Sequence, residues 1–103
     1  MVELIHRKRI DILVDAPLSD WLADVAASVG IAHHTLMHLA SGTGKSGAWR
    51  DEDVSGAVSK RMFIAIANAD KVQALIDALA PYLDSYGLVV SIIDVDVVRG
   101  ERF

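Results

Sequence analysis

The chain has 103 residues, of which 52% are hydrophobic, and a net charge of −4. This length predicts a single domain, 1–103, with enough apolar material for a core. The negative charge argues against general nucleic-acid binding, and no apolar run approaches the roughly 18 residues that insertion into a membrane needs. The lack of cysteine excludes disulfides and thiolate metal sites. The basic N-terminus leads directly into a strand pattern rather than a signal-peptide core, so we expect a cytoplasmic protein.

The first expected element is a strand over residues 8 to 15, where apolar and polar side chains alternate. Alternation with a period of two is typical of a strand with one buried face. Pro17 ends this strand, because proline has no N–H group to give to a ladder. The face predicted to point inward carries Ile10, Ile12 and Val14.

A helix is expected next, over residues 19 to about 29. Ser19 is a suitable N-cap residue, and Gly30 stands where helices often end in a left-handed residue. Residues 33 to 41 then predict a second strand with a weaker pattern.

The second half of the chain repeats this order. Residues 59 to 67 predict the third strand. A second helix follows, capped by Asn68 or Asp70 and ended near Pro81. The chain is completed by a turn and a long strand, at 84–87 and 88–98.

The order β-α-β-β-α-β predicts an α+β fold of the ferredoxin-like type, with two helices on one face of a four-stranded antiparallel sheet. The other face would be bare and apolar, which favours assembly through the sheet. A tolerated apolar surface on a monomer is the alternative. The residues expected on the bare face are Leu13, Phe63, Ala65 and Ala67.

Residues 41 to 56 read SGTGKSGAWRDEDVSG and show no apolar period, so we expect a long irregular loop with a functional role. The backbone N–H groups of Gly42 and Gly44 can converge on an anion there, and Lys45 adds positive charge. The tip, with an exposed Trp49, would be presented to a protein partner. A flexible loop without any ligand is the alternative.

A nucleoside-triphosphatase P-loop is rejected for this segment. The motif needs a glycine five residues before Gly44, and Leu39 occupies that position. No helical pattern follows the loop, whereas a P-loop must open a helix that holds phosphate.

Three histidines, at positions 33, 34 and 38, invite a metal-site hypothesis. On a strand, His34 and His38 lie about 13 Å apart at about 3.3 Å per residue, so one chain cannot place both on one ion. Only a site shared between subunits would remain.

Carboxylates also alternate on strand faces, with Asp94 and Asp96 on the last strand and Asp11 and Asp15 on the first. We interpret them as solvated or salt-bridged faces, because no nucleophile is placed beside them by the sequence. Cations expected at strand ends would either neutralise these carboxylates or surround a bound phosphate. They are Lys8, Arg9, Lys60, Arg61, Arg99 and Arg102.

Residues 9 to 47 resemble the first half of the PII signalling proteins. The likeness includes a helix that ends in V-G-I and a second strand that runs into a G-x-G, here Gly42 to Gly44, at the start of the T-loop. Lys45 and Ser46 match the basic and polar pair that follows in the family. The closing VVRGERF is similar to the family's R-x-G-E ending, one residue shorter.

The resemblance implies a non-enzymatic homotrimer with a T-loop over about 42–58 and adenine nucleotides in clefts between subunits. The T-loop base, the B-loop and the C-terminal arginines hold the nucleotide in that family. The residues assigned to nucleotide binding on this basis are Gly42, Thr43, Gly44, Lys45, Ser46, Arg61, Gly87, Arg99 and Arg102.

The chain departs from the family pattern in two places. Trp49 and Arg50 stand where the T-loop tip usually has a tyrosine, and the B-loop is reduced to DSYG at 84–87, without its lysine. These departures argue against tight ATP binding and 2-oxoglutarate sensing. They are more similar to divergent PII-like proteins of inorganic-carbon handling, which implies ADP or AMP and bicarbonate as ligands, no obligatory cofactor, and association with carboxysomes.

Two other functions stay open on the residues alone. A CutA-like trimer would be structural or bind metal through histidines across an interface, without nucleotide sensing. A nucleotide hydrolase would need magnesium ligands, for which the only clustered candidates on the loop are Asp51, Glu52 and Asp53.

Overall fold

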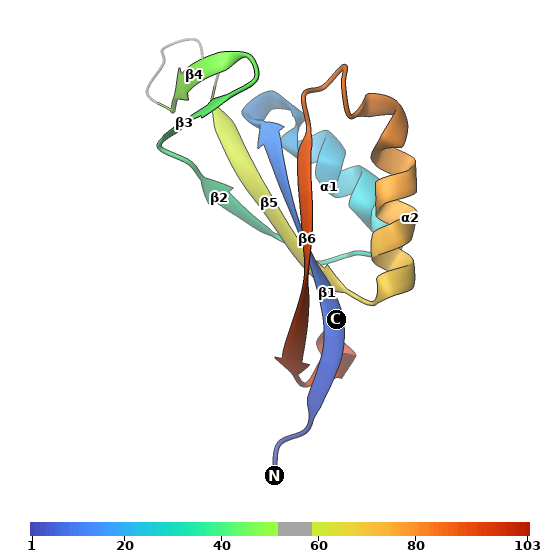
Figure 1. Ribbon diagram of the computed structural model, residues 1–103. Helices are drawn as coiled ribbons and strands as arrows, with labels where there is room; N and C mark the ends of the chain where they lie inside the picture. The colour runs from blue at the N-terminus through green and yellow to red at the C-terminus, as the bar shows by residue number, and fades with distance from the viewer. Residues whose placement is uncertain (52–58) are drawn as a thin grey trace.

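The computed structural model describes residues 1–51 and 59–103. In this part of the chain two α-helices pack on one face of a four-stranded sheet, an arrangement that can be followed in Figure 1. The strand order is β2-β5-β1-β6, and every neighbouring pair is antiparallel. The predicted α+β architecture is therefore confirmed. The sheet and helix bounds are β1 Leu4–Asp15, α1 Ser19–Ser28, β2 Thr35–His38, β5 Lys60–Ala67, α2 Ala69–Leu79 and β6 Val89–Val98.

Shorter elements join these parts. A two-stranded hairpin, β3 Ser41–Gly44 and β4 Gly47–Arg50, is inserted between β2 and β5. Short 3-10 turns follow β1, α2 and β6, at η1 Ala16–Leu18, η2 Ala80–Tyr82 and η3 Gly100–Arg102.

The helix ends follow local chemistry, with one correction. Ser19 is not the N-cap of α1; that position is Leu18, and the Ser19 hydroxyl donates to the carbonyl of Ala16, 2.7 Å away. The 3-10 turn of η1 occupies the backbone positions that a capping serine would need. Gly30 has φ of 92°, as predicted for the residue beyond a helix end. Asn68 caps α2 by accepting a hydrogen bond from the N–H of Lys71.

The core lies between the sheet and the helices. Ile10, Ile12 and Val14 of β1 are fully buried, as their alternation predicted. Phe63 of β5 pairs with Ile12 in the ladder and is also fully buried. The remaining helix-side core includes Ala65, Ala67, Leu22, Ala26, Val72, Leu75 and Leu79.

The prediction that Phe63, Ala65 and Ala67 lie on the bare face is wrong, because these three residues point toward the helices. The register explains this, since residues paired across a ladder share a face and Phe63 pairs with a core residue of β1. Leu13 does lie on the open face, as expected. Its companions there from β5 are Met62, Ile64 and Ile66.

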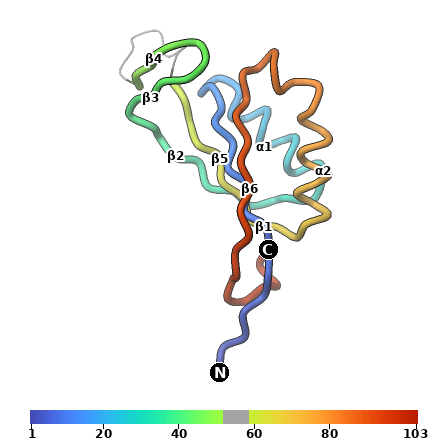
Figure 2. Tube along the Cα trace, viewed as in Figure 1, coloured from blue at the N-terminus to red at the C-terminus, as the bar shows by residue number. Residues whose placement is uncertain are grey.

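Beyond the end of β5, residues 4–7 of β1 pair with residues 95–98 of β6 alone, and this two-stranded ribbon extends beyond the helices, as the trace in Figure 2 shows. At the base of this ribbon Lys8 pairs with Asp94, and His6 lies 3.3 Å from the same carboxylate. The charged faces predicted for these strands are therefore salt-bridged.

Neither α1 nor α2, the only α-helices in the described part of the chain, has the length and hydropathy that crossing a membrane requires.

Candidate functional site

The segment predicted as an irregular loop begins as a hairpin. Ser41 to Gly44 pair with Gly47 to Arg50, and a two-residue loop of Lys45 and Ser46 connects the strands. Gly47 adopts φ of 107°, a conformation that favours glycine and allows the chain to reverse so tightly. Short, glycine-rich strands carry little apolar periodicity, and for this reason the pattern did not reveal them.

Residues 42 to 44 run extended in β3 and do not curl around a point. The converging backbone N–H groups expected of an anion nest are therefore not formed in this structure. Gly42 instead lies beneath the indole of its cross-strand partner, and a Cβ at this position would lie 2.5 Å from Cζ2 of Trp49. Trp49 is only partly exposed, so the expectation that it forms an exposed tip is wrong.

Asp51 anchors the hairpin to the end of the sheet. Its N–H donates to the carbonyl of Ala40, and its carboxylate accepts a 2.8 Å hydrogen bond from Nη1 of Arg61. The hydroxyl of Ser59 donates to the Asp51 carbonyl at 3.1 Å. Arg61, which the sequence assigned to the nucleotide, is thus held by a carboxylate at the hairpin base.

A second contact joins the hairpin to the sheet. The ammonium of Lys60 lies 5.9 Å from the centroid of the Trp49 ring, within cation–π range. The same ammonium forms an ion pair with Asp15 at the end of β1. The Gly87 turn lies at this end of the sheet as well, because the neighbouring Val89 pairs with Leu13 near the end of β1.

Arg99 lies at the opposite end, where it follows β6 with φ of 58°, an uncommon left-handed conformation for a side-chain-bearing residue. This bend seats Gly100 on Ile5 so closely that an added Cβ would be 2.8 Å from two side-chain carbons of Ile5. Arg7 donates from Nη2 to the Gly100 carbonyl. Together these contacts fix the C-terminal turn against β1.

The two C-terminal arginines line separate cavities. Arg99 borders a cavity of about 360 Å³ together with Arg7, Glu3 and Glu101. Arg102 borders a second cavity of about 220 Å³ that also contains Lys71 and His33. Lys71 and Arg7 were not among the predicted site residues. The sequence contains only weak signals for these two residues. Lys71 is a cation in the first turn of the second predicted helix, and Arg7 continues the alternation of the first predicted strand toward the N-terminus.

The predicted site residues therefore form two groups at opposite ends of the sheet. Gly42 to Ser46, Arg61 and Gly87 lie where β1 ends, whereas Arg99 and Arg102 lie near Leu4, where β1 begins. Eleven residue steps along β1 span on the order of 35 Å at about 3.3 Å per residue. One chain cannot bring both groups to one small ligand.

Most of the cations proposed for a phosphate site have carboxylate partners within the chain. Lys8 and Arg9 lie within β1 rather than at its end, and they pair with Asp94 and Asp11. Lys60 and Arg61 pair with Asp15 and Asp51. Among the described residues, ion pairs are absent for Arg99, Arg102 and Lys45.

The histidines do not gather. His34 stacks on Phe63 with ring centroids 4.7 Å apart, and His38 lies 4.0 Å from Asp51. Within residues 1–51 and 59–103, three or more His, Asp or Glu side chains never meet in a metal-binding arrangement. Of the acidic run proposed for a hydrolase, Asp51 is paired with Arg61, and Glu52 and Asp53 lie outside the described residues.

The split β-α-β arrangement with an inserted hairpin defines a ferredoxin-like α+β protein. The family model for the nitrogen regulatory protein P-II matches residues 7–102 of the chain. The chain therefore belongs to the PII family, whose members are signal transducers rather than enzymes.

Solved structures show the same fold at low sequence identity. The PII-like protein CPII from Thiomonas intermedia K12, bound to ADP, AMP and bicarbonate, matches with a TM-score of 0.92 and 21% identity, over 100% of this chain and 98% of that chain. A putative PII-like signalling protein from Thermus thermophilus matches with a TM-score of 0.84 and 20% identity, over 98% of each chain. A search among curated protein sequences found no significant match.

Proposed function

We propose that this PII-family chain assembles as a homotrimer and binds ADP or AMP in the clefts between subunits. The hairpin turn of one chain, with Lys45 and Ser46, would face the phosphates. Arg99 and Arg102 of a neighbouring chain would supply the positive charge. The domain comprises residues 1–103, and the T-loop covers about 42–58.

The separation of the two residue groups supports this proposal most directly. Residues at opposite ends of one sheet can share a ligand only if the end of one chain meets the beginning of another, as in a closed ring of head-to-tail copies. The apolar open face of the sheet gives such copies a surface to bury. Arg99 and Arg102, without ion pairs among the described residues, are available to an anionic ligand.

Bicarbonate is the second proposed ligand, with a role in inorganic-carbon regulation, in the cytoplasm and in association with carboxysomes. Support comes from the relative CPII, which binds ADP, AMP and bicarbonate. The nucleotide would reorganise the hairpin, because a phosphate bound by Arg61 would compete with Asp51, which now holds that arginine at the hairpin base. The hairpin would then present a changed surface to a protein target.

Isothermal titration with AMP, ADP and ATP, each with and without bicarbonate, tests the ligand assignment. We expect saturable binding of ADP or AMP, accompanied by a change in Trp49 fluorescence measured in a Trp21→Phe background. The absence of heat and of any fluorescence change with all three nucleotides would remove the proposal.

A complementation experiment tests the shared site. Lys45→Ala and Arg99→Ala should each weaken nucleotide binding while leaving the assembly intact. Mixed trimers, made by co-refolding the two variants, should regain binding, because some clefts combine an intact Lys45 from one chain with an intact Arg99 from another. A site within one chain would not be restored by mixing, since every chain would carry one of the two defects.

A further inference from the structure

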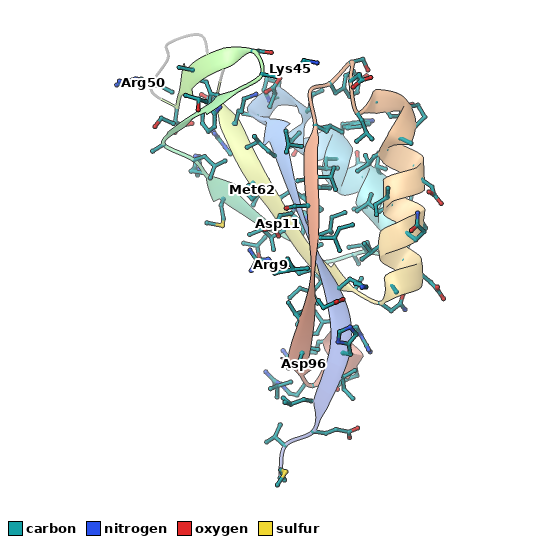
Figure 3. All side chains as sticks on the ribbon, viewed as in Figure 1. Arg9, Asp11, Lys45, Arg50, Met62 and Asp96 are labelled. Atoms are coloured by element: carbon teal, nitrogen blue, oxygen red, sulfur yellow. The ribbon has the colours of Figure 1, made fainter. Side chains whose placement is uncertain are left out.

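The open face of the sheet contains an ion pair with mostly apolar neighbours; a second pair, Lys60 with Asp15, lies at the end of the same face. Arg9 and Asp11, two residues apart on β1, are joined by two hydrogen bonds, Nε to Oδ1 at 2.8 Å and Nη2 to Oδ2 at 3.0 Å. Figure 3 shows both side chains, with Met62, on the side of the sheet away from the helices. In the ladders, Arg9 is flanked by Ile66 and Ile93.

The neighbours of this pair are mostly apolar, and several of them are exposed. Asp11 is flanked by Ile64 on β5 and by Ser91 on β6. Farther along the same face, Ile93 is 53% exposed and Val89 is 60% exposed. A contact that buries these side chains must also remove water from the charged pair between them.

The Arg9–Asp11 pair uses only part of its own hydrogen-bonding capacity. A guanidinium has five N–H donors, and Arg9 uses two of them on its own Asp11. Each oxygen of Asp11 accepts one of those bonds and keeps capacity for another. The Arg9 side chain is 37% exposed and that of Asp11 is 23% exposed, so solvent reaches the unused groups now.

Burial of this face would leave those donors unpaired unless the covering surface provides acceptors. A surface that provides donors would likewise be needed for Asp11. An ordinary apolar partner has neither, and unpaired buried charge is strongly destabilising. A second copy of this chain has both, because the same two residues carry the unused donors and the unused acceptors.

We propose that Arg9 and Asp11 specify the interface between copies of this chain, with Arg9 of one copy donating its free N–H groups to Asp11 of the next. The proposal rests on the homotrimer suggested above. In a closed ring each copy gives to one neighbour and receives from the other, so the unused groups of both Arg9 and Asp11 are satisfied in every copy. Another protein lacking this paired arrangement would be rejected at the same surface.

Sedimentation velocity and native mass spectrometry over a dilution series test the inference. Arg9→Met leaves the carboxylate uncompensated, and Asp11→Asn, which has nearly the same shape, leaves the guanidinium uncompensated. Each variant should raise the concentration at which the assembly dissociates by at least about tenfold. The double variant Arg9→Met with Asp11→Leu removes both charges and should dissociate within about threefold of the wild type.

Lys8→Met is the matched control. Lys8 is also a β1 cation with a carboxylate partner, but it lies on the other face of the strand, toward solvent on the ribbon. Its loss should leave the assembly unchanged. Circular dichroism confirms the folding of each variant, and Asp11→Asn provides an independent measurement if Arg9→Met does not fold.

The outcomes separate this inference from the proposed function. A monomeric wild type would remove the trimer itself. The wild type could instead be trimeric while its Arg9→Met and Asp11→Asn variants dissociate no more readily than Lys8→Met. That result would overturn the role of the ion pair and leave the trimer standing. A double variant as weak as the single ones would also overturn it, because the loss would then come from shape and not from unpaired charge.

Discussion

The Trp49 ring packs over Gly42 in the hairpin, and this packing depends on the absence of a side chain at position 42. An indole stacked on a glycine backbone shields the short strand pair and brings the ring within reach of Lys60. The hairpin has few apolar side chains of its own, so this packing is a main source of its order.

Gly42→Ala should therefore displace the Trp49 ring, because the new Cβ would lie 2.5 Å from a ring carbon. In a Trp21→Phe background we expect a red-shifted emission from Trp49 and faster amide exchange in β3 and β4. Gly44→Ala is the control, since a Cβ at Gly44 meets no atom within 4 Å. Equal spectra for the two variants would contradict the packing.

Gly100 presents a similar restriction at the other end of the molecule. Gly100→Ala should destabilise the chain by about 1–3 kcal/mol in chemical denaturation, because its Cβ would clash with the Ile5 side chain. The Ile5→Ala background removes two of the three obstructing carbons, Cγ1 and Cγ2, and keeps Cβ, so Gly100→Ala should cost less there than in the wild-type background. If the alanine cost the same in both backgrounds, the clash with the γ carbons of Ile5 would not be its cause.

At the scale of elements, charged side chains pair across β1 and β6. Lys8 donates to Asp94, and this hydrogen bond, followed by the charge of Lys8, lowers the pKa of the Asp94 carboxyl. Both partners are substantially exposed, so salt screens the interaction.

The pH dependence of stability follows from the lowered pKa of Asp94. A carboxylate with a lower pKa in the folded state stabilises the protein above the pKa of the unfolded chain, and the contribution disappears as pH falls through the folded pKa. The stability difference between wild type and Lys8→Met should thus shrink between about pH 5 and pH 2. Urea denaturation at several pH values in low salt measures it, and a constant difference across that range would contradict the linkage.

At the scale of the whole molecule, the sheet separates the proposed ligand residues and offers a single apolar face to neighbours. A ligand that bridges two chains stabilises both their folded state and their association. In thermal unfolding, ADP at about 100 times its Kd should stabilise the native assembly by about 2.7 kcal/mol.

Arg99→Ala should reduce this ADP-dependent shift in Tm while leaving the Tm without ligand nearly unchanged, because its side chain lines a cavity and makes no ion pair with the described residues. Gln73→Ala, an exposed change on the far side of α2, is the control. An undiminished ADP shift in Arg99→Ala would argue against this arginine as a ligand residue.

Much of the fold could be predicted from local pattern. The period of two over β1 identified Ile10, Ile12 and Val14 as buried, and Asn68 and Gly30 marked helix ends through backbone chemistry. The family also followed from short motifs around Gly42 and Arg99, and the family model confirmed it.

The inward face of β5 could not be predicted in this way. Met62, Ile64 and Ile66 are as apolar as Phe63, Ala65 and Ala67, so alternation gives two equal choices. Only the pairing of Phe63 with Ile12 decides which set lies under the helices. The hairpin could not be predicted for a related reason, because glycine-rich strands have no apolar face that a sequence pattern would reveal.

The sequence by itself determined the order of the four sheet strands and the two helices, and the family, since these depend on neighbours along the chain. The tertiary structure decided which face of the sheet is covered, that Arg9 and Asp11 meet on the open one, and that Arg99 lies far from the hairpin. Those properties depend on strand register and on distance through space, for which spacing along a chain carries no information.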